Sequence, residues 1–578
     1  MALGSPCPRL GEAIAKRRGA RHETPASAAA GSAQDKHQGE RLVMASERLG
    51  AMQEWTMRVT AVIDHAAREA GGREIVSRWA DGSETRTDWA GIRRDALKMA
   101  QALQRLGLRP GDKVASLAMN HSRHLVSWYG VAGMGGVLHT VNPRLFDDQL
   151  EYIVSHAEDR VLCYDAAFQP IVDRMKSRWP TVEHYICYDS GAHAPAFEDW
   201  IAAEDGDFEW VTGQETDPCM ICYTSGTTGN PKGVQYEHRS TVLHALAGLQ
   251  SAAFNFSSAS VMLPVVPMFH AASWGLPYSG AMAGIKFVFS AVNDPAVLHD
   301  LMIREGVTDS AGVPTVWLAH FQYCDREGLD LPPLKAATIG GSAAPKFMIE
   351  RLLRNGTRVQ HAWGMTETSP IGTVGGPTWD WDSLTLAEKV EKTAMQGRPI
   401  FGVQLRTVDL ADMSTELPRD GKTSGALQIR GPWIIKRYFK AERDAVGNDG
   451  WFDTGDVGII HPDGTLQLTD RTKDVIKSGG EWISSVELEN AACGHPGVAE
   501  AACIGIYHPK WDERPVLFVV KKAGAEVTSE DILDHLRPQI AKWWMPDAVE
   551  FVDDIPHTAT GKISKKDLRE RFADYTLA

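Results

Sequence analysis

Hydrophobic positions along the chain follow two alternating spacings. Residues 88–106 place apolar side chains three and four apart, as in a helix, and Gly107 with the turn at 109–112 ends that pattern. Residues 113–119 and 136–140 are short apolar runs typical of buried strands, and a helical pattern at 124–132 separates them. Further strands are predicted at 261–264, 286–289, 309–312 and 336–339. This order of strands and helices predicts parallel sheets covered by helices.

The pattern changes after residues 397–399. Short apolar runs at 404–408 and 425–430, separated by Gly, Pro and Asp, predict a small, mostly antiparallel β subdomain over 397–469. A dense charged run at 470–474 follows, and beyond it we expect helices at 485–493 and 529–540 and strands at 500–505 and 516–520. We therefore predict an α/β protein with a large N-terminal domain (44–469) of two mostly parallel, helix-covered sheets plus the β subdomain. A small, mobile α+β domain (470–578) follows, with its hinge at Asp470.

Length, charge and cysteine content exclude several classes. A chain of 578 residues is too long for one core, and its net charge of −14 argues against a nucleic-acid binder. No apolar run reaches the roughly 18–20 residues that cross a bilayer. The eight cysteines are scattered, which suits a reducing compartment, and we expect a cytoplasmic protein. The lone C-x-x-C of Cys219 and Cys222 lacks a second ligand pair and predicts a buried strand rather than a metal or redox site.

The first 43 residues differ from the rest in composition. They are rich in Ala, Gly, Arg and Ser, with a basic run at 16–18 and no apolar segment of the kind that a secretory signal needs. Three interpretations stay open: a disordered extension, an organelle transit peptide, or an initiator at Met44. We favour the first or the third.

The strongest chemical motif is the string YTSGTTGNPKGV at residues 223–234. Its glycines permit a tight turn whose backbone amides point inward, and its hydroxyls and lysine add further donors, which suits a triphosphate. It has no Walker A spacing. The candidate anion-binding residues are Thr224, Ser225, Gly226, Thr227, Thr228, Gly229 and Lys232.

Four further strings occur downstream, GGSAAP at 340–345, WGMTET at 363–368, WFDTGD at 451–456 and PHTATGKI at 556–563. Together with the first, they make the chain, from about Thr60 to Arg571, similar to the adenylate-forming superfamily of acyl-CoA synthetases, luciferases and peptide-synthetase adenylation domains. Within it, the chain most resembles medium- and long-chain fatty acyl-CoA ligases, including the branch that acts on methylthiopropionate.

The resemblance implies a nucleotide site. The adenine would lie along Gly341, Ser342 and Ala343, near His361, and against Trp363, Gly364 and Met365. Many relatives carry tyrosine where this chain has Trp363, so we expect the stacking surface to remain and the phenol hydrogen bond to be lost. Thr366 would contact the α-phosphate, Thr224 and Glu367 would hold Mg²⁺, an ion that prefers oxygen ligands, and Asp456 and Arg471 would hold the ribose.

The resemblance also implies a site for coenzyme A and a catalytic lysine. The segment of Lys477, Ser478, Gly479, Gly480, Glu481 and Trp482 turns toward the active site for the thiol step in relatives. Lys562 would stabilise charge on the α-phosphate during adenylation. It must approach for the first step and withdraw for the second, which implies rotation of the small domain about Asp470.

The acyl pocket is expected in residues 265–278. By resemblance, His270 would lie near the substrate carboxylate, and Trp274 and Gly275, with Gly340, would line the pocket, where the glycine leaves room for a chain. Packed core roles for His270 and Trp274 stay open as alternatives. No Arg or Lys in this segment could pair a second carboxylate, so we expect an apolar monocarboxylate.

The expected function is that of an AMP-forming ligase of acids and thiols. A carboxylic acid and ATP would give acyl-AMP and pyrophosphate, and coenzyme A would then displace AMP. We favour a medium-chain to long-chain fatty acid, with 3-methylthiopropionate or another short acid as the alternative. A carrier-protein arm or an oxygenase reaction as acceptor, and a non-catalytic nucleotide-binding homologue, are the rival hypotheses. A monomer and a homodimer are both compatible with the sequence.

The two-step scheme makes a prediction for Lys562→Ala. The variant should lose adenylation, measured as ATP–pyrophosphate exchange, by at least about 100-fold, because a preorganised cation at the developing charge is removed. Thioester formation from supplied acyl-AMP and coenzyme A should be largely retained. Equal loss of both half-reactions would contradict a lysine that serves only the first.

Overall fold

The computed structural model describes residues 52–189, 194–224, 230–479, 481–558 and 563–577. The chain divides into two units at Trp55 and Thr56, and of the first unit only residues 52–55 are described. All that follows concerns Thr56–Ala578. The predictions for residues 1–43 lie outside the described residues.

The largest sheet has nine strands in the order β15-β14-β13-β12-β11-β9-β10-β1-β2. In this spatial order, each strand from β13 to β1 is parallel to its neighbour. At the two edges, β2 is antiparallel to β1, β14 to β13 and β15 to β14. The strands are β1 (Glu74–Arg78), β2 (Glu84–Asp88), β9 (Val261–Pro264), β10 (Lys286–Ser290), β11 (Asp309–Gly312), β12 (Ala336–Ile339), β13 (Arg358–Gly364), β14 (Ile371–Val374) and β15 (Arg398–Pro399).

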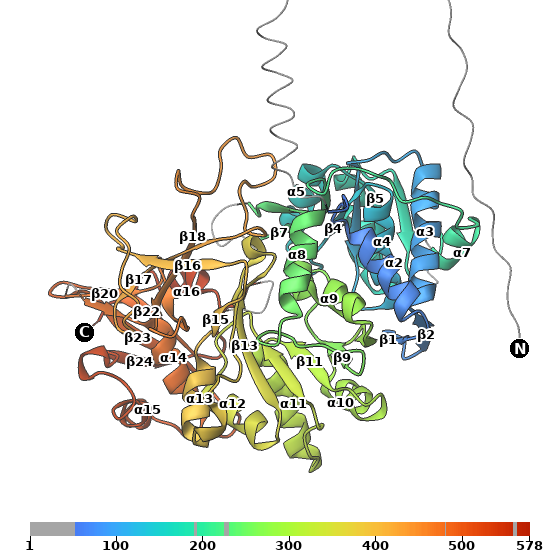
Figure 1. Ribbon diagram of the computed structural model, residues 1–578. Helices are drawn as coiled ribbons and strands as arrows, with labels where there is room; N and C mark the ends of the chain where they lie inside the picture. Colours follow the sequence, from blue (N-terminus) through green and yellow to red (C-terminus); the bar gives the residue numbers. More distant parts are fainter. Residues whose placement is uncertain (1–51, 190–193, 225–229, 480, 559–562, 578) are drawn as a thin grey trace, which may run out of the picture. The chain divides into compact units, whose positions relative to one another are not determined.

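A second sheet of six strands has the order β6-β5-β3-β4-β7-β8, and Figure 1 labels its strands β4, β5 and β7. Only β8 runs antiparallel to its neighbour. The strands are β3 (Lys113–Leu117), β4 (Val137–Thr140), β5 (Asp159–Tyr164), β6 (His184–Cys187), β7 (Pro218–Tyr223) and β8 (Gly233–Glu237). Cys219 and Cys222 both lie buried on β7, as the pattern predicted.

Amphipathic helices cover these sheets. The helix predicted at 88–106 is α3, and it begins where the Asp88 carboxylate accepts a hydrogen bond from the amide of Gly91, a typical N-cap. The helices are α2 (Val59–Glu69), α3 (Trp89–Arg105), α4 (Ser122–Gly133), α5 (Asp147–Ala157), α6 (Gln169–Met175), α7 (Phe197–Ala202), α8 (His238–Gly248), α9 (Leu276–Ala283), α10 (Pro295–Arg304), α11 (Pro314–Glu327), α12 (Lys346–Arg354) and α13 (Leu386–Ala394).

The C-terminal third contains two further sheets. An antiparallel one, β16-β17-β18-β19, comprises β16 (Gln404–Val408), β17 (Ser424–Arg430), β18 (Phe452–Ile460) and β19 (Leu466–Arg471). The last comprises β20 (Ile476–Ser478), β21 (Glu481–Ile483), β22 (Val498–His508), β23 (Asp512–Lys521) and β24 (Ala548–Phe551), with helices α14 (Ser485–Cys493), α15 (Ser529–Leu536) and α16 (Lys565–Arg571). The predicted fold class, two mostly parallel helix-covered sheets, a β subdomain and a smaller α+β part, is confirmed.

One predicted helix is too long. The pattern at 529–540 suggested three turns, but α15 ends at Leu536. Pro538 follows two residues later, and because proline lacks an amide donor it cannot continue the helical hydrogen bonds. The boundary predicted at 469/470 falls inside β19, which ends at Arg471, so the domain limits stay predictions.

Among the helices that the structure describes, none is both long enough and apolar enough to cross a membrane.

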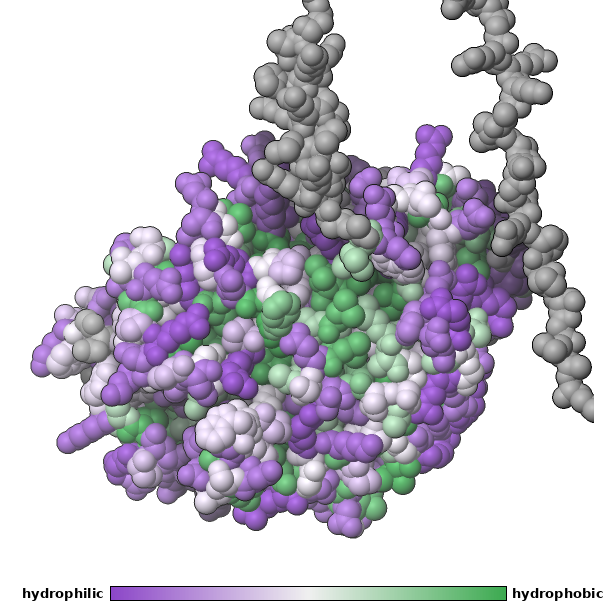
Figure 2. Space-filling model, in the orientation of Figure 1, coloured by the Kyte–Doolittle hydropathy of each residue, from purple (hydrophilic) through white to green (hydrophobic). Residues whose placement is uncertain are grey.

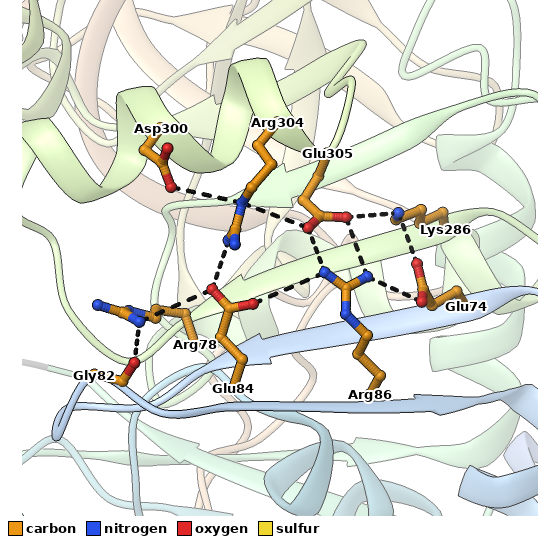
Figure 3. A network of polar contacts seen from close by, with 9 residues as sticks. All are labelled: Glu74, Arg78, Gly82, Glu84, Arg86, Lys286, Asp300, Arg304 and Glu305. Carbon is orange, nitrogen blue, oxygen red and sulfur yellow. Dashed lines mark hydrogen bonds and ion pairs between the residues drawn. The ribbon is translucent and has the colours of Figure 1, made fainter.

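An ion-pair network joins the β1–β2 edge to the end of α10. Figure 3 shows Arg86 of β2 and Lys286 of β10 directed at the carboxylates of Glu305 and Glu74. The Arg86–Glu305 contact is 2.6 Å and the Lys286–Glu305 contact is 2.8 Å. The Glu305 side chain is only 5% exposed. Burial alone would raise its pKa, but the two cations lower the pKa below the usual value, so Glu305 is ionised and paired.

We predict that Glu305→Ala lowers the free energy of unfolding by about 1–2 kcal/mol, because it removes the most buried partner of Arg86 and Lys286, although Glu74 still pairs with both cations. Asp300→Ala is the matched control, since Asp300 is an exposed carboxylate 3.6 Å from Arg304 and should contribute less than about 0.5 kcal/mol. Denaturant unfolding near neutral pH measures both. Equal effects would show that the network does not anchor α10.

Candidate functional site

A cavity of about 890 Å³ collects most of the described candidate residues. One part of its wall is polar and charged, with Thr224, Asn230, Lys232, Thr366, Glu367, Asp453, Thr454, Arg471, Thr472 and Lys473. The other part is mainly apolar, with Val265, Val266, Pro267, Phe269, Ala271, Trp274, Val313, Val316, Ala319, Gly340 and Ala362. A cavity lined by both kinds of side chain suits a ligand that carries both phosphate and hydrocarbon.

Two hydrogen bonds between Thr224 and Lys232 join the ends of the turn between β7 and β8. The amide of Thr224 donates to the carbonyl of Lys232 at 2.9 Å, and the amide of Lys232 donates to the Thr224 hydroxyl at 3.1 Å. Both residues line the cavity. The predicted residues Ser225, Gly226, Thr227, Thr228 and Gly229 lie between them, outside the described part of the chain.

Glu367 is the best-defined carboxylate of the site. It sits on the short helix η4 (Thr366–Thr368), which the backbone of Ile435 anchors through a 2.8 Å hydrogen bond to the Glu367 carbonyl. The Tyr438 hydroxyl donates to Glu367 Oε1 at 2.8 Å, and the Lys232 ammonium lies 4.8 Å from the centre of the Tyr438 ring. Lys232, Tyr438 and Glu367 therefore form one cation–ring–carboxylate arrangement at the cavity wall.

Burial governs the charge of Glu367. The residue is 6% exposed, and desolvation raises its pKa above the usual value, although the Tyr438 hydrogen bond and the charges of Lys232 and Arg471 oppose that rise. An ionised carboxylate in this position is therefore short of positive charge. A bound cation would supply it, which is the property expected of a magnesium ligand.

Trp363 bonds to the residue that was predicted to hold the ribose. Its indole Nε1 donates to Asp456 Oδ2 at 2.9 Å, and Arg471 Nε lies 3.4 Å from Asp456 Oδ1. Asp456 and Arg471 are direct register partners of β18 and β19. The expectation that tryptophan forfeits a hydrogen bond here is therefore incomplete, because the indole N–H provides one of its own.

The predicted adenine loop contributes only partly to the wall. Gly340 and Gly341 line the cavity, together with Gly364 and Met365, whereas Ser342 and Ala343 are not among the lining residues. His361 is buried behind the loop, where Nε2 faces the amide of Ala344 at 3.3 Å and Nδ1 faces the carbonyl of Ala394 at 3.0 Å. We therefore assign His361 the positioning of this loop rather than a contact with the base.

The apolar wall is built on strained backbone. His270 and Trp274 line the cavity, and Ala271, Ser273 and Trp274 have φ angles of 41°, 47° and 56°. Such left-handed conformations cost of order 1 kcal/mol each in residues other than glycine. A side chain on Gly340 would approach Trp274 Cη2 to 3.1 Å, so the glycine admits the indole.

The structure indicates a backbone role for Gly275, and its expected place in the wall of the acyl pocket stays a prediction. A Cβ at this position would lie 2.6 Å from the imidazole of His244, and φ is +74°. Gly275 therefore makes room for His244 and permits a left-handed turn, and it is not among the residues that line the cavity.

The described part of the segment expected to bind coenzyme A does not line the cavity in this conformation. Gly479 donates its amide to the carbonyl of Trp511 at 2.7 Å, Ser478 accepts from Arg514, and the Lys477 ammonium lies 5.3 Å from the Trp482 ring. None of these residues is among those that line the cavity. Gly480, the Glu481 side chain and Lys562 fall outside the described residues.

The predicted hinge residue is held by hydrogen bonds. Asp470 is 4% exposed, and its Oδ2 accepts from both the amide and the hydroxyl of Ser485, each at 2.6 Å. Burial raises its pKa, and the charge of Lys565 opposes that shift. Rotation about Asp470 would have to break or carry along these contacts, so the hinge stays a prediction.

Several lining residues were missed from the sequence. Asp453 and Lys473 stand inside strings that were noted for other residues, and Arg144 and Tyr438 were not singled out. Arg144 lies 5.9 Å from the Phe269 ring, so the cavity does have a cation near its apolar wall, although none comes from residues 265–278.

We predict that Glu367→Gln raises the thermal midpoint without ligands. The raised pKa means that the folded state holds the proton more tightly than the unfolded state, so the ionised carboxylate destabilises the fold above the folded pKa, and this penalty disappears as pH falls. The gain should therefore be larger at about pH 8 than at about pH 5. Glu391→Gln, at an exposed ion pair with Lys346, is the control and should show no such gain. A lower midpoint for Glu367→Gln at both pH values would contradict the assignment.

Comparison with known proteins agrees with this geometry. Residues 63–439 match the AMP-binding enzyme family, and residues 487–562 match the AMP-binding enzyme C-terminal domain. The 3-methylmercaptopropionyl-CoA ligase of Ruegeria lacuscaerulensis is 45% identical, covering 91% of this chain and 99% of that one. The medium-chain-fatty-acid–CoA ligase of Ectopseudomonas oleovorans is 43% identical, covering 92% and 98%. The fold matches that of an anthranilate CoA ligase in complex with anthranoyl-AMP, with a TM-score of 0.80 at 23% identity over 90% of this chain and 98% of that one. The chain belongs to the AMP-binding enzyme family.

Proposed function

We propose that this enzyme is an AMP-forming acid–CoA ligase. The observation that carries the proposal is a single cavity lined both by the polar cluster of Lys232, Tyr438 and Glu367 and by apolar side chains such as Trp274 and Phe269. Relatives of 43% and 45% identity that match over nearly their whole length are named as CoA ligases, which supports the same activity here.

The reaction proceeds in two displacements. A carboxylate oxygen of the acid attacks the α-phosphorus of ATP, the bond from that phosphorus to the bridging oxygen breaks, and pyrophosphate leaves with the electron pair. The sulfur of coenzyme A, as thiolate, then attacks the acyl carbon, and AMP leaves. Both steps require little covalent chemistry from the protein, so positioning and charge stabilisation dominate.

The polar lining residues supply these requirements. The Lys232 ammonium would bind phosphate oxygens, and Arg471, which lines the cavity, would hold the ribose together with its ion-pair partner Asp456, which is not among the lining residues. Glu367 and the Thr224 hydroxyl offer the hard oxygen donors that fit Mg²⁺, and the buried, under-compensated carboxylate fits a cation. When bound, Mg²⁺ neutralises charge on the phosphates.

The apolar lining residues favour a monocarboxylic acid with a hydrocarbon chain. Val265, Val316 and Ala319 offer no partner for a second charge, and the Trp274 indole packed against Gly340 limits the space available. We propose a medium-chain to long-chain fatty acid. A short thioether acid such as 3-methylthiopropionate is the alternative, because one relative is named for it. Arg144 is the group through which a dicarboxylate could bind instead.

We predict that Trp274→Ala shifts the preference toward longer acids. Pyrophosphate release should be measured over a panel of fatty acids, 3-methylthiopropionate and a dicarboxylate, with and without coenzyme A. Removing the indole opens the wall, so kcat/KM for long acids should rise about tenfold relative to that for short ones. Trp379→Ala, at a fully exposed tryptophan, is the control and should leave the profile unchanged.

Three outcomes would overturn parts of the proposal. A best substrate with two carboxylates would replace the monocarboxylate assignment and point to Arg144. AMP release that does not depend on coenzyme A would favour another acceptor. No ATP–pyrophosphate exchange with any acid would favour a nucleotide-binding homologue without catalysis.

A further inference from the structure

Two helices bring together three side chains that can bind a metal and that are not among the predicted catalytic residues. His299 comes from α10, and His320 and Cys324 come from α11, where their spacing of four puts them on one face. Nδ1 of His299 lies 3.2 Å from Nε2 of His320 and 3.6 Å from Sγ of Cys324. The three ligand atoms all lie within 4.8 Å of one another.

The two distances from His299 Nδ1 match the edges of a metal-centred tetrahedron, and the third edge, between His320 and Cys324, is at most 4.8 Å. With Zn–N bonds of about 2.0–2.1 Å and a Zn–S bond of about 2.3 Å, tetrahedral angles place two nitrogens about 3.3 Å apart and a nitrogen and a sulfur about 3.6 Å apart. A hydrogen-bonded cluster explains the arrangement less well. One imidazole nitrogen carries either a single proton or a single lone pair, so Nδ1 of His299 cannot be well aligned with both His320 and Cys324.

Burial sets the protonation states of these side chains before a cation binds. His320 is 2% exposed, and desolvation lowers its pKa to about 4, so its imidazole is neutral near neutral pH and has a lone pair to offer. Cys324 is fully buried, and burial raises the pKa of its thiol, so metal binding must release that proton to solvent. His299 is only half-buried, which leaves an approach for the ion and a place for water as fourth ligand.

The helices that carry the ligands are fixed. The network of Figure 3 ties the end of α10 to β2 and β10 through Glu305, six residues after His299. On α11, Arg351 of α12 pairs with Asp325 at 2.6 Å, beside Cys324. The ligands therefore come from two anchored helices, which limits the conformational entropy lost on binding.

We propose that His299, His320 and Cys324 form a binding site for one borderline-soft divalent cation of the Zn²⁺ class. Nitrogen and sulfur ligands select such an ion over Mg²⁺, which prefers oxygen, so this site is chemically distinct from the one at Glu367. Val316 and Ala319 of the same helix line the cavity. The ion would link that wall to α10.

Cobalt substitution tests the site in the full chain. Protein stripped with a chelator is titrated with Co²⁺ in excess Mg²⁺, and the spectrum is followed. We expect one Co²⁺ per chain, with the intense visible bands of tetrahedral cobalt and a thiolate-to-metal charge-transfer band, both removed when Zn²⁺ is added. Binding of Zn²⁺ should also raise the thermal midpoint.

Substitutions assign the ligands. Cys324→Ser should abolish the charge-transfer band. His299→Gln, at a half-buried position where the fold tolerates a polar side chain, should weaken binding at least about tenfold. Cys493→Ser is the control, because Cys493 is the one cysteine among the described residues that is not buried, and this variant should bind as the wild type does. Absence of the charge-transfer band in the wild type, or its persistence in Cys324→Ser, would overturn the proposal and leave a hydrogen-bonded cluster.

Discussion

A buried carboxylate without sufficient positive charge is the feature on which the site depends. Glu367 has one hydroxyl partner, Tyr438, whose ring also faces the Lys232 ammonium. These three residues come from η4, the segment after β17 and the turn before β8, so their meeting requires the nine-stranded sheet, the six-stranded sheet and the β subdomain to pack together. The ionised Glu367 carboxylate destabilises this junction until the cation and the phosphate bind. Ligand binding and the stability of the junction are therefore coupled.

Most helices and strands could be predicted from local sequence patterns, because the spacing of apolar residues follows the geometry of the element that buries them. Strands at 261–264, 309–312 and 336–339 agree residue for residue with β9, β11 and β12, since short apolar runs bounded by turns have few other solutions. The helical spacing predicted over 88–106 agrees with α3 within one residue at each end, and the Asp88 carboxylate caps an amide three residues away. The predicted end of α15 was too late because apolar residues continue at helical spacing to residue 540, whereas Pro538 cannot donate the amide hydrogen bond that a longer helix needs.

The site was less accessible from sequence because its contacts join distant segments. Trp363 and Asp456 are 93 residues apart, so the indole hydrogen bond to the predicted ribose ligand had no local signal. Gly275 was interpreted through chain space in the pocket, yet the atoms that demand glycine belong to His244, thirty-one positions earlier. Motifs thus identified which residues matter, while the reason for each depended on tertiary neighbours.

The central claim is that a carboxylate attacks the α-phosphorus of ATP in the cavity that Glu367 and Trp274 share. Labelling both carboxylate oxygens of a medium-chain acid with ¹⁸O and analysing the products by mass spectrometry tests it most directly. The account predicts one ¹⁸O in AMP and none in pyrophosphate. Unlabelled AMP formed together with the thioester would contradict it, because the acid would then have been activated at another phosphorus.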